Sequence, residues 1–165
     1  MRVSALALAL GATLLVSAGG SQQGNAASDQ PSANHAEMQF MRMVNTERER
    51  RGMKPLAWDT TLAQASRSHS REMADLEYFD HESPVPGRRT PADRWERLVP
   101  NPPNAYTIAE NLFYGTQPDV AWGHRELMES QDHRDNILNG GFSKVGVGVH
   151  MDQDGEMWVT EMFLS

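Results

Sequence analysis

The C-terminal segment of the chain constrains its fold more than any other. Two short runs, KVGVGVHM and EMWVTEMFLS, flank Asp154-Gly155, a dipeptide that strongly signals a hairpin turn. The chain is therefore predicted to end in two antiparallel strands. The glycines of GVGV fall inside the first strand, where they predict a bulge or a close approach of another backbone. A further stretch, TIAENLFYG, is short and partly β-like.

Helical patterns dominate the sequence upstream of these strands. Apolar residues recur at helical spacing after Asn34, a plausible N-cap, and again after a cap at Asp59 or Thr60. Pro91 is placed to open a short helix, and Asp119 to open another. Helices that come first, with strands mostly late and antiparallel, predict an α+β fold in which helices pack on a small sheet.

The N-terminus has the pattern of a secretory signal peptide. After Arg2 the chain is uncharged and strongly apolar over residues 3–18, which is short for a membrane span of about 20 residues. No later segment is apolar for long enough to cross a bilayer. The predicted organisation is a signal peptide over residues 1–27, cleaved after Ala18 or Ala27, a flexible tail over 28–33, and one domain over 34–165.

The composition of the chain limits where the protein can be located and which partners it can bind. The 165 residues contain no cysteine, which excludes disulfides and a lipid-modified cysteine, so an exported chain must rely on its core. The formal net charge is −7, which disfavours nucleic acid and anionic membrane surfaces as partners. We therefore expect a secreted or periplasmic protein whose partner is an extracellular or envelope component.

Two of the six histidines are candidates for a site. His81 and His133 are each expected in a polar loop beside a helix end, and each follows an aspartate. Loop residues of this kind are better functional candidates than core residues. His69, in contrast, falls on the inner face of the second predicted helix, where a structural role is expected. The zinc motif HExxH and the nucleophile motif GxSxG do not occur.

Several stretches over roughly residues 36–163 carry a resemblance to a known family: VNTERERRGMKPLAWDTTLAQASRSHSREMA, FDHESPVPGRRTPADRWERL, AENLFYG, ESQDHRDNIL, VGVGV and WVTEMF. In this order they resemble the CAP domain, the superfamily of cysteine-rich secretory proteins, antigen 5 and plant pathogenesis-related proteins. The resemblance is strongest to its cysteine-free bacterial branch. The resemblance implies an α-β-α sandwich, with helices on both sides of a small, mainly antiparallel sheet, and a polar cleft.

The resemblance also implies which residues line that cleft. They are His81, Glu110 and His133, with Ser130 at the position where many eukaryotic members have a second glutamate. Glu161 likewise replaces a glutamine that the family often has. Family clefts have been seen with metal between the two histidines, with the glutamate acting through water. His81 and His133 are therefore candidate ligands for a divalent ion such as zinc, although a purely structural polar cluster is an equal alternative.

Three classes of function are compatible with these residues. We favour a binding module that takes a lipid, a peptide or an envelope component in the cleft. The alternative is a metal-dependent hydrolase of peptidase or esterase type, in which Glu110 is the general base for water on a metal held by His81 and His133. The third class is a structural or interaction domain of the envelope. The absence of a nucleophile motif and of the second glutamate disfavours the enzyme.

Overall fold

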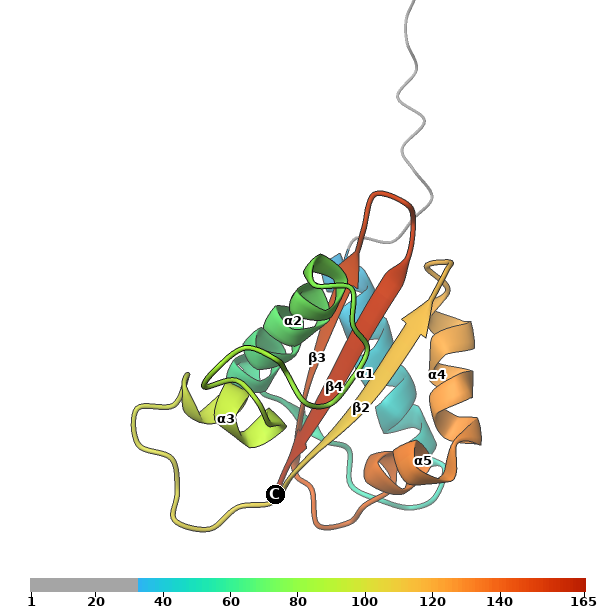
Figure 1. Ribbon diagram of the computed structural model, residues 1–165. Helices are drawn as coiled ribbons and strands as arrows, with labels where there is room; N and C mark the ends of the chain where they lie inside the picture. The colour runs from blue at the N-terminus through green and yellow to red at the C-terminus, as the bar shows by residue number, and fades with distance from the viewer. Residues whose placement is uncertain (1–32) are drawn as a thin grey trace, which may run out of the picture.

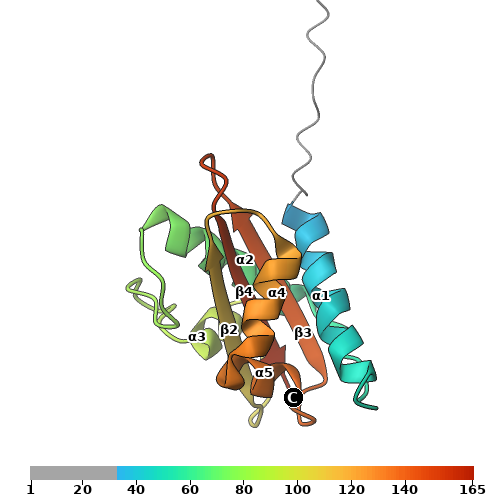
Figure 2. The same ribbon diagram turned by 90° about the vertical axis from the view of Figure 1, so that its right-hand side faces the viewer.

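A four-stranded sheet lies between two layers of helices (Figures 1 and 2). The computed structural model describes residues 33–165, so the predicted signal peptide and its two cleavage sites lie outside the described residues. The first helix, α1, begins at Ala33, so Asn34 lies inside its first turn and is not its N-cap. The predicted α-β-α sandwich is confirmed.

The strands run in the order β1-β3-β4-β2 across the sheet. Their bounds are Ala57–Trp58 for β1, Ile108–Gly115 for β2, Lys144–Met151 for β3 and Met157–Leu164 for β4. β4 pairs antiparallel with both β3 and β2, whereas the two-residue β1 pairs parallel with β3. The sheet is therefore mainly antiparallel, as predicted, and β2 forms one of its edges.

The helices divide between the two faces of the sheet. Helices α2 (Thr60–Asp75) and α3 (Pro91–Glu96) cover one face, and α1 (Ala33–Glu49), α4 (Val120–Glu129) and α5 (Gln131–Ile137) cover the other. β4 is buried throughout because both its faces are covered. Val159 and Phe163 point to the α1 side, and Met162 and Leu164 point to the α2 side.

The glycines of β3 let α2 pack directly against the strand. A Cβ atom on Gly146 would lie 2.1 Å from the backbone nitrogen of Ala63, and one on Gly148 would lie 2.0 Å from that of Arg67. In that narrow gap Ser66 donates a hydrogen bond to the carbonyl of Gly146. The predicted close approach is thus confirmed, and it fixes α2 against the sheet.

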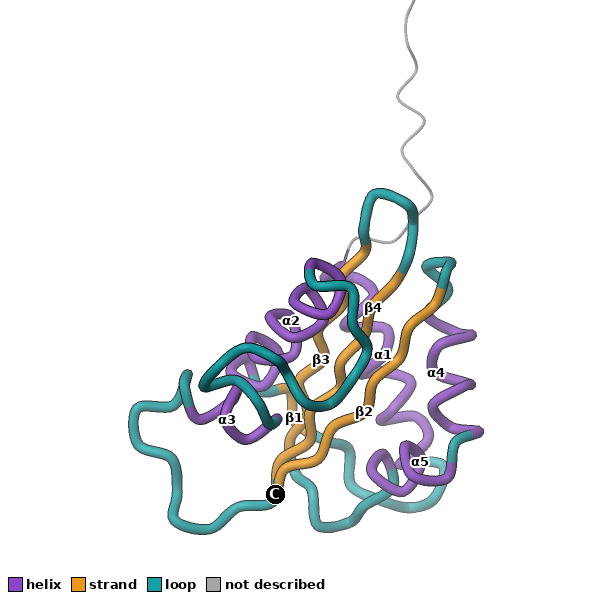
Figure 3. The backbone as a smooth tube through the Cα atoms, viewed as in Figure 1, coloured by secondary structure: helices purple, strands orange, loops and turns teal. Residues whose placement is uncertain are grey.

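The predicted helix starts are confirmed at three caps. The Asp59 side chain accepts hydrogen bonds from the first turn of α2, and Asp119 does the same for α4. Thr90 and Asp93 form a capping box at α3, with Pro91 at its first position. The long loop between α2 and α3 then crosses the face of the sheet, as Figure 3 shows in teal.

The prediction of a loop around His133 is wrong. Residues 131–137 form the helix α5, which starts after Ser130 adopts an extended backbone conformation that ends α4. Ile137 is fully buried at the end of α5, so a single apolar anchor holds this otherwise polar helix in place. His133 is therefore on a helix, whereas His81 is in a loop as predicted. Among the described residues, no helix is both long and apolar enough to span a membrane.

Candidate functional site

The side chain of Glu110 is the centre of a polar cluster on edge strand β2. It is 1% exposed and faces the α2–α3 layer. The Nη2 of Arg94 lies 2.6 Å from its Oε2, and the Nδ1 of His81 lies 3.0 Å from its Oε1. Both carboxylate oxygens are therefore held by cationic or polar donors. The His81 side chain is 51% exposed, so it presents the far side of its ring to solvent.

Arg94 also fastens the loop that carries His81. Its Nη1 lies 3.1 Å from each of three backbone carbonyl oxygens, those of His81, Arg88 and Arg89. Arg94 itself is held by the capped helix α3 and is almost fully buried. One guanidinium therefore fixes the position of His81 and compensates the charge of Glu110. The sequence analysis did not find Arg94, because an arginine in a short charged helix has no distinguishing pattern.

A second buried carboxylate, Glu72 on α2, ties down the other end of the same loop. Its side chain accepts hydrogen bonds from Tyr78 and Ser83, and an ion pair of 3.0 Å joins it to Arg88. Burial alone would raise the pKa of Glu72, but these donors hold it below its ordinary value. Glu72 therefore serves as an anionic anchor for the loop.

His69 lies between the two carboxylates. Its imidazole is fully buried, 3.9 Å from Glu72 and 4.0 Å from Glu110, and its Nε2 lies 3.0 Å from the carbonyl oxygen of Asp80. Burial lowers the pKa of His69. A neutral ring with Nε2 donating to Asp80 fits this geometry, which agrees with the structural role expected for His69. The bond to Asp80 also lets His69 help to position the loop that carries His81.

His133 approaches the cluster from the other layer of the sandwich. The side chain of Asn111, on β2, donates to the His133 carbonyl at 3.1 Å, and Asn136 donates to Asn111 at 2.9 Å. These amides fix α5 against the edge strand. Burial lowers the pKa of His133, and the positive charge of His81 lowers it further. The hydrogen bond to Glu110 instead raises the pKa of His81.

The structure thus joins His81 to Glu110 and brings His133 within the electrostatic reach of His81. It does not do the same for Ser130. This residue is half-buried between α4 and α5, and across residues 33–165 its hydroxyl caps no helix and forms no hydrogen bond with the other three side chains. Ser130 is the residue at which the chain turns from α4 into α5.

The donors present suit a weak, open metal site at most. Among residues 33–165, no group of three or more histidine, aspartate and glutamate side chains is arranged to hold a metal ion. Two imidazoles are nevertheless available. A histidine that ligates a metal usually donates its second ring nitrogen to a carboxylate, and His81 donates its Nδ1 to Glu110. Within residues 33–165, the Nε2 of His81 has no hydrogen-bond partner.

Comparison with known proteins identifies the family. The sequence profile of the cysteine-rich secretory protein family, CAP, matches residues 41–163. The chain belongs to the CAP family. It is 36% identical over 145 residues to the uncharacterized protein YkwD of Bacillus subtilis, and this match covers 85% of the chain and 51% of YkwD. The uncharacterized membrane protein YlbC of Bacillus subtilis is 30% identical over 118 residues, which cover 69% of the chain and 31% of YlbC.

Solved structures show the same CAP fold. An extracellular protein from Bacillus anthracis with an SCP domain aligns with a TM-score of 0.69 at 30% identity, covering 79% of the chain and 40% of that protein. An outer surface protein of Borrelia burgdorferi aligns with a TM-score of 0.70 at 14% identity, covering 82% and 96%. The chain spans about half or less of the length of the Bacillus proteins that it matches. It lacks cysteine, as expected for the bacterial branch.

Proposed function

We propose that this CAP domain is a secreted or surface-exposed binding module, with His81 and His133 as the groups that it presents to its ligand. One observation carries the proposal: both oxygens of Glu110 are held, by Arg94 and by His81. The carboxylate therefore orients an imidazole and is not free to take a proton from water. The exposed ring of His81 and the half-buried ring of His133 are left to contact a ligand.

The electrostatics of the site suit a ligand with anionic or hydrogen-bond-accepting groups. The pKa of His81 is raised by its hydrogen bond to Glu110, and that of His133 is lowered by burial, so His81 takes up a proton more readily than His133. Envelope components offer such groups as carboxylates, amides and lipid head groups. The extracellular protein of Bacillus anthracis and the outer surface protein of Borrelia burgdorferi support an external location for this chain.

An NMR titration of histidine side chains tests this binding function. The probes are a short peptide with a free carboxyl terminus, a disaccharide-peptide fragment of the cell wall, and a short-chain anionic phospholipid. At least one probe should shift the His81 and His133 signals in a saturable way. The variant His81→Gln should lose that response, whereas His150→Gln should keep it, because His150 lies at the far end of β3 beside Trp158. If no probe shifts either signal, the proposal fails.

We further propose that the two histidines bind one zinc-like divalent ion weakly. When bound, such an ion would supply a Lewis acid at the ligand-facing side of the site. Calorimetry should show zinc binding that weakens as the pH falls through about 6, since protons compete for imidazole nitrogen. His81→Ala and His133→Ala should each abolish it, and Glu110→Gln should weaken it less. Unchanged binding in the double histidine variant would place the ion elsewhere.

The hydrolase alternative predicts turnover that depends on Glu110. We expect little or no hydrolysis of peptides or esters, with or without added zinc. The ion pair with Arg94 would have to break before Glu110 acted as a general base. A broad panel of peptide and ester substrates decides between the two functions. Robust activity that Glu110→Gln abolishes would favour the hydrolase over the binding module.

A further inference from the structure

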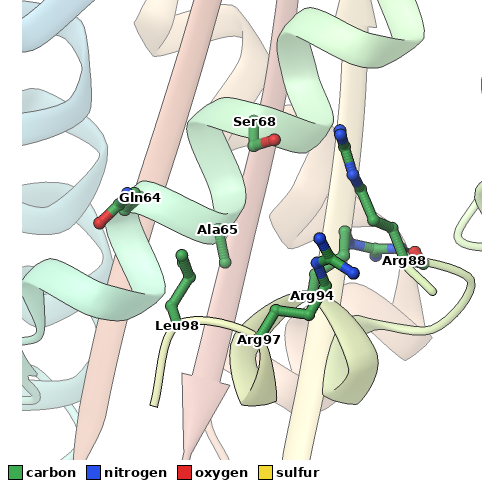
Figure 4. A pocket seen from close by; sticks show the side chains of 7 residues that line it. All are labelled: Gln64, Ala65, Ser68, Arg88, Arg94, Arg97 and Leu98. Atoms are coloured by element: carbon green, nitrogen blue, oxygen red, sulfur yellow. Dashed lines mark hydrogen bonds between the residues drawn. The ribbon is translucent and has the colours of Figure 1, made fainter. Parts of the chain in front are cut away.

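A cavity of about 230 Å³ lies between α2 and α3, on the same face of the sheet as Glu110 (Figure 4). Its lining includes neither His81 nor His133. Its polar and charged walls come from α2 on one side and from α3 and its flanking loops on the other. The residues that form them are Gln64 and Ser68 of α2, and Arg88, Arg94 and Arg97.

The cavity carries a positive charge that its surroundings do not neutralise. Arg88 is paired with Glu72, and Arg94 is paired with Glu110. Arg97 forms no ion pair with any residue that the structure describes. Because each carboxylate compensates one arginine, one guanidinium is left in excess. This excess stands out in a chain whose formal net charge is −7.

The guanidinium of Arg97 is held beside the loop that carries Arg88. A Cβ atom on Gly87 would lie 3.0 Å from the Nη1 of Arg97, so that guanidinium packs against the Gly87 backbone. Gly87 has a φ of +75°, a conformation that favours glycine and lets the loop turn there. The third arginine is exposed, and its guanidinium lies beside the loop that carries Arg88.

Unused hydrogen-bond donors surround the same cavity. The Nε of Arg94 is buried and has no acceptor among the described residues. Buried donors are almost always paired, so an unpaired one next to a cavity indicates a missing acceptor. Gln64 and Ser68 are exposed and form no side-chain hydrogen bond within residues 33–165, so their polar groups face solvent at the cavity. The walls thus offer donors and positive charge without an acceptor to match.

We propose that this cavity binds an oxyanion of the phosphate or carboxylate type, carried on a small apolar group. The planar fork of arginine matches both kinds of oxyanion, and charge-assisted hydrogen bonds are the strong ones. Ala65 and Leu98 supply an apolar part of the lining, which fits a substituent on the anion. This site differs from the histidine site in its lining and in its chemistry, although Arg94 contributes to both.

Calorimetric titration with four probes tests the proposal. The probes are butyl phosphate, butyrate, inorganic phosphate and neutral butanol. At least one organic anion should bind saturably and more tightly than inorganic phosphate, since only the organic anions use Ala65 and Leu98. The preference between butyl phosphate and butyrate identifies the oxyanion. Arg97→Gln should weaken binding about tenfold, as expected for one charge-assisted hydrogen bond.

Matched variants separate the cavity from general surface charge. Arg125→Gln removes an exposed arginine from α4, on the other face of the sheet, and should leave the affinity unchanged. Ser68→Glu places a carboxylate in the wall and should abolish binding, while His81→Gln should retain it. The proposal is overturned if no anion binds, if butanol binds as tightly as the anions, or if Arg97→Gln and Arg125→Gln bind equally.

Discussion

The pKa values of His81 and His133, which interact electrostatically, move in opposite directions. The hydrogen bond to Glu110 raises the pKa of His81, while burial and then the charge of His81 lower that of His133. We predict that an NMR titration will show His81 protonating first as the pH falls. In His81→Gln the pKa of His133 should rise, because one of the two causes that lower it is gone. An unchanged pKa of His133 would show that the two rings do not interact.

Glu161 is a carboxylate enclosed on all sides. It is fully buried on β4, its Oε2 accepts a hydrogen bond from Asn111, and its Oε1 has no partner among the described residues. Burial raises its pKa from 4.5 to about 7. Between these two values the folded state keeps a proton that the unfolded state has lost, so stability falls as the pH rises through this window.

The variant Glu161→Gln tests that prediction. A neutral amide removes the ionisation, so the variant should be more stable than the wild type at pH 8, by up to about 3 kcal/mol. Near pH 4.5 the two proteins should be closer in stability. Urea unfolding at both pH values measures the difference, with Glu129→Gln on the exposed side of α4 as the control. Parallel stability curves for Glu161→Gln and the wild type would refute the assigned pKa.

At the scale of elements, the contact between α2 and β3 depends on two glycines. Gly146→Ala and Gly148→Ala each place a methyl group about 2 Å from α2 backbone nitrogens, so the helix must move away from the strand. We predict a loss of about 1–3 kcal/mol or more in each case, measured by urea unfolding. Gly140→Ala is the matched control, since a Cβ there would meet nothing within 4 Å. Equal losses at all three positions would contradict the close packing.

The features that could be predicted from the sequence are those that depend on residues close together in the chain. Asp59, Thr90 and Asp119 cap helices through their own first turns, and Asp154-Gly155 marks the turn between the last two strands, so these features can be predicted without tertiary information. The sequence predicts a loop around His133 and not the helix α5, because one buried side chain, Ile137, holds the helix, and a single anchor leaves no periodicity to detect.

The site was predictable only in part, because it depends on contacts between segments that are distant in the sequence. His81 and His133 are candidates from their polar surroundings in the sequence, and the family resemblance adds Glu110 and links the three distant segments. Arg94 escaped, because its role depends on three carbonyls of a loop that folds back over the sheet. Ser130 entered the candidate site through the same resemblance, as the residue at the position of the family's second glutamate. Its side chain forms no cap hydrogen bond at the start of α5.

At the scale of the whole molecule, the two edges of the sheet differ in what covers them. Edge β2 carries the polar site, which joins residues from both helical layers. At the opposite edge, β1 pairs only with Lys144 and Val145, so the rest of β3 has no neighbouring strand on that side. An unpaired strand edge can pair with another chain unless it is covered.

Glu37 covers this open edge and joins the two helical layers. It is buried on α1, accepts a hydrogen bond from the backbone nitrogen of Val149 at 3.3 Å, and binds Arg67 of α2 through both carboxylate oxygens at 2.7 and 2.5 Å. One carboxylate therefore contacts the sheet and both layers around it. Its loss would leave a buried strand amide without an acceptor.

We predict that Glu37→Ala lowers the free energy of unfolding by about 1–3 kcal/mol, the cost of leaving such a donor unpaired. The control is Glu47→Ala on the same helix, whose partners Arg50 and Arg51 are exposed, so its loss should stay within about 1 kcal/mol. Because Glu37→Ala uncovers the β3 edge, it should also associate at high concentration in size-exclusion chromatography, whereas Glu47→Ala should not. Equal stability and equal elution of the two variants would show that the β3 edge is protected by something other than Glu37.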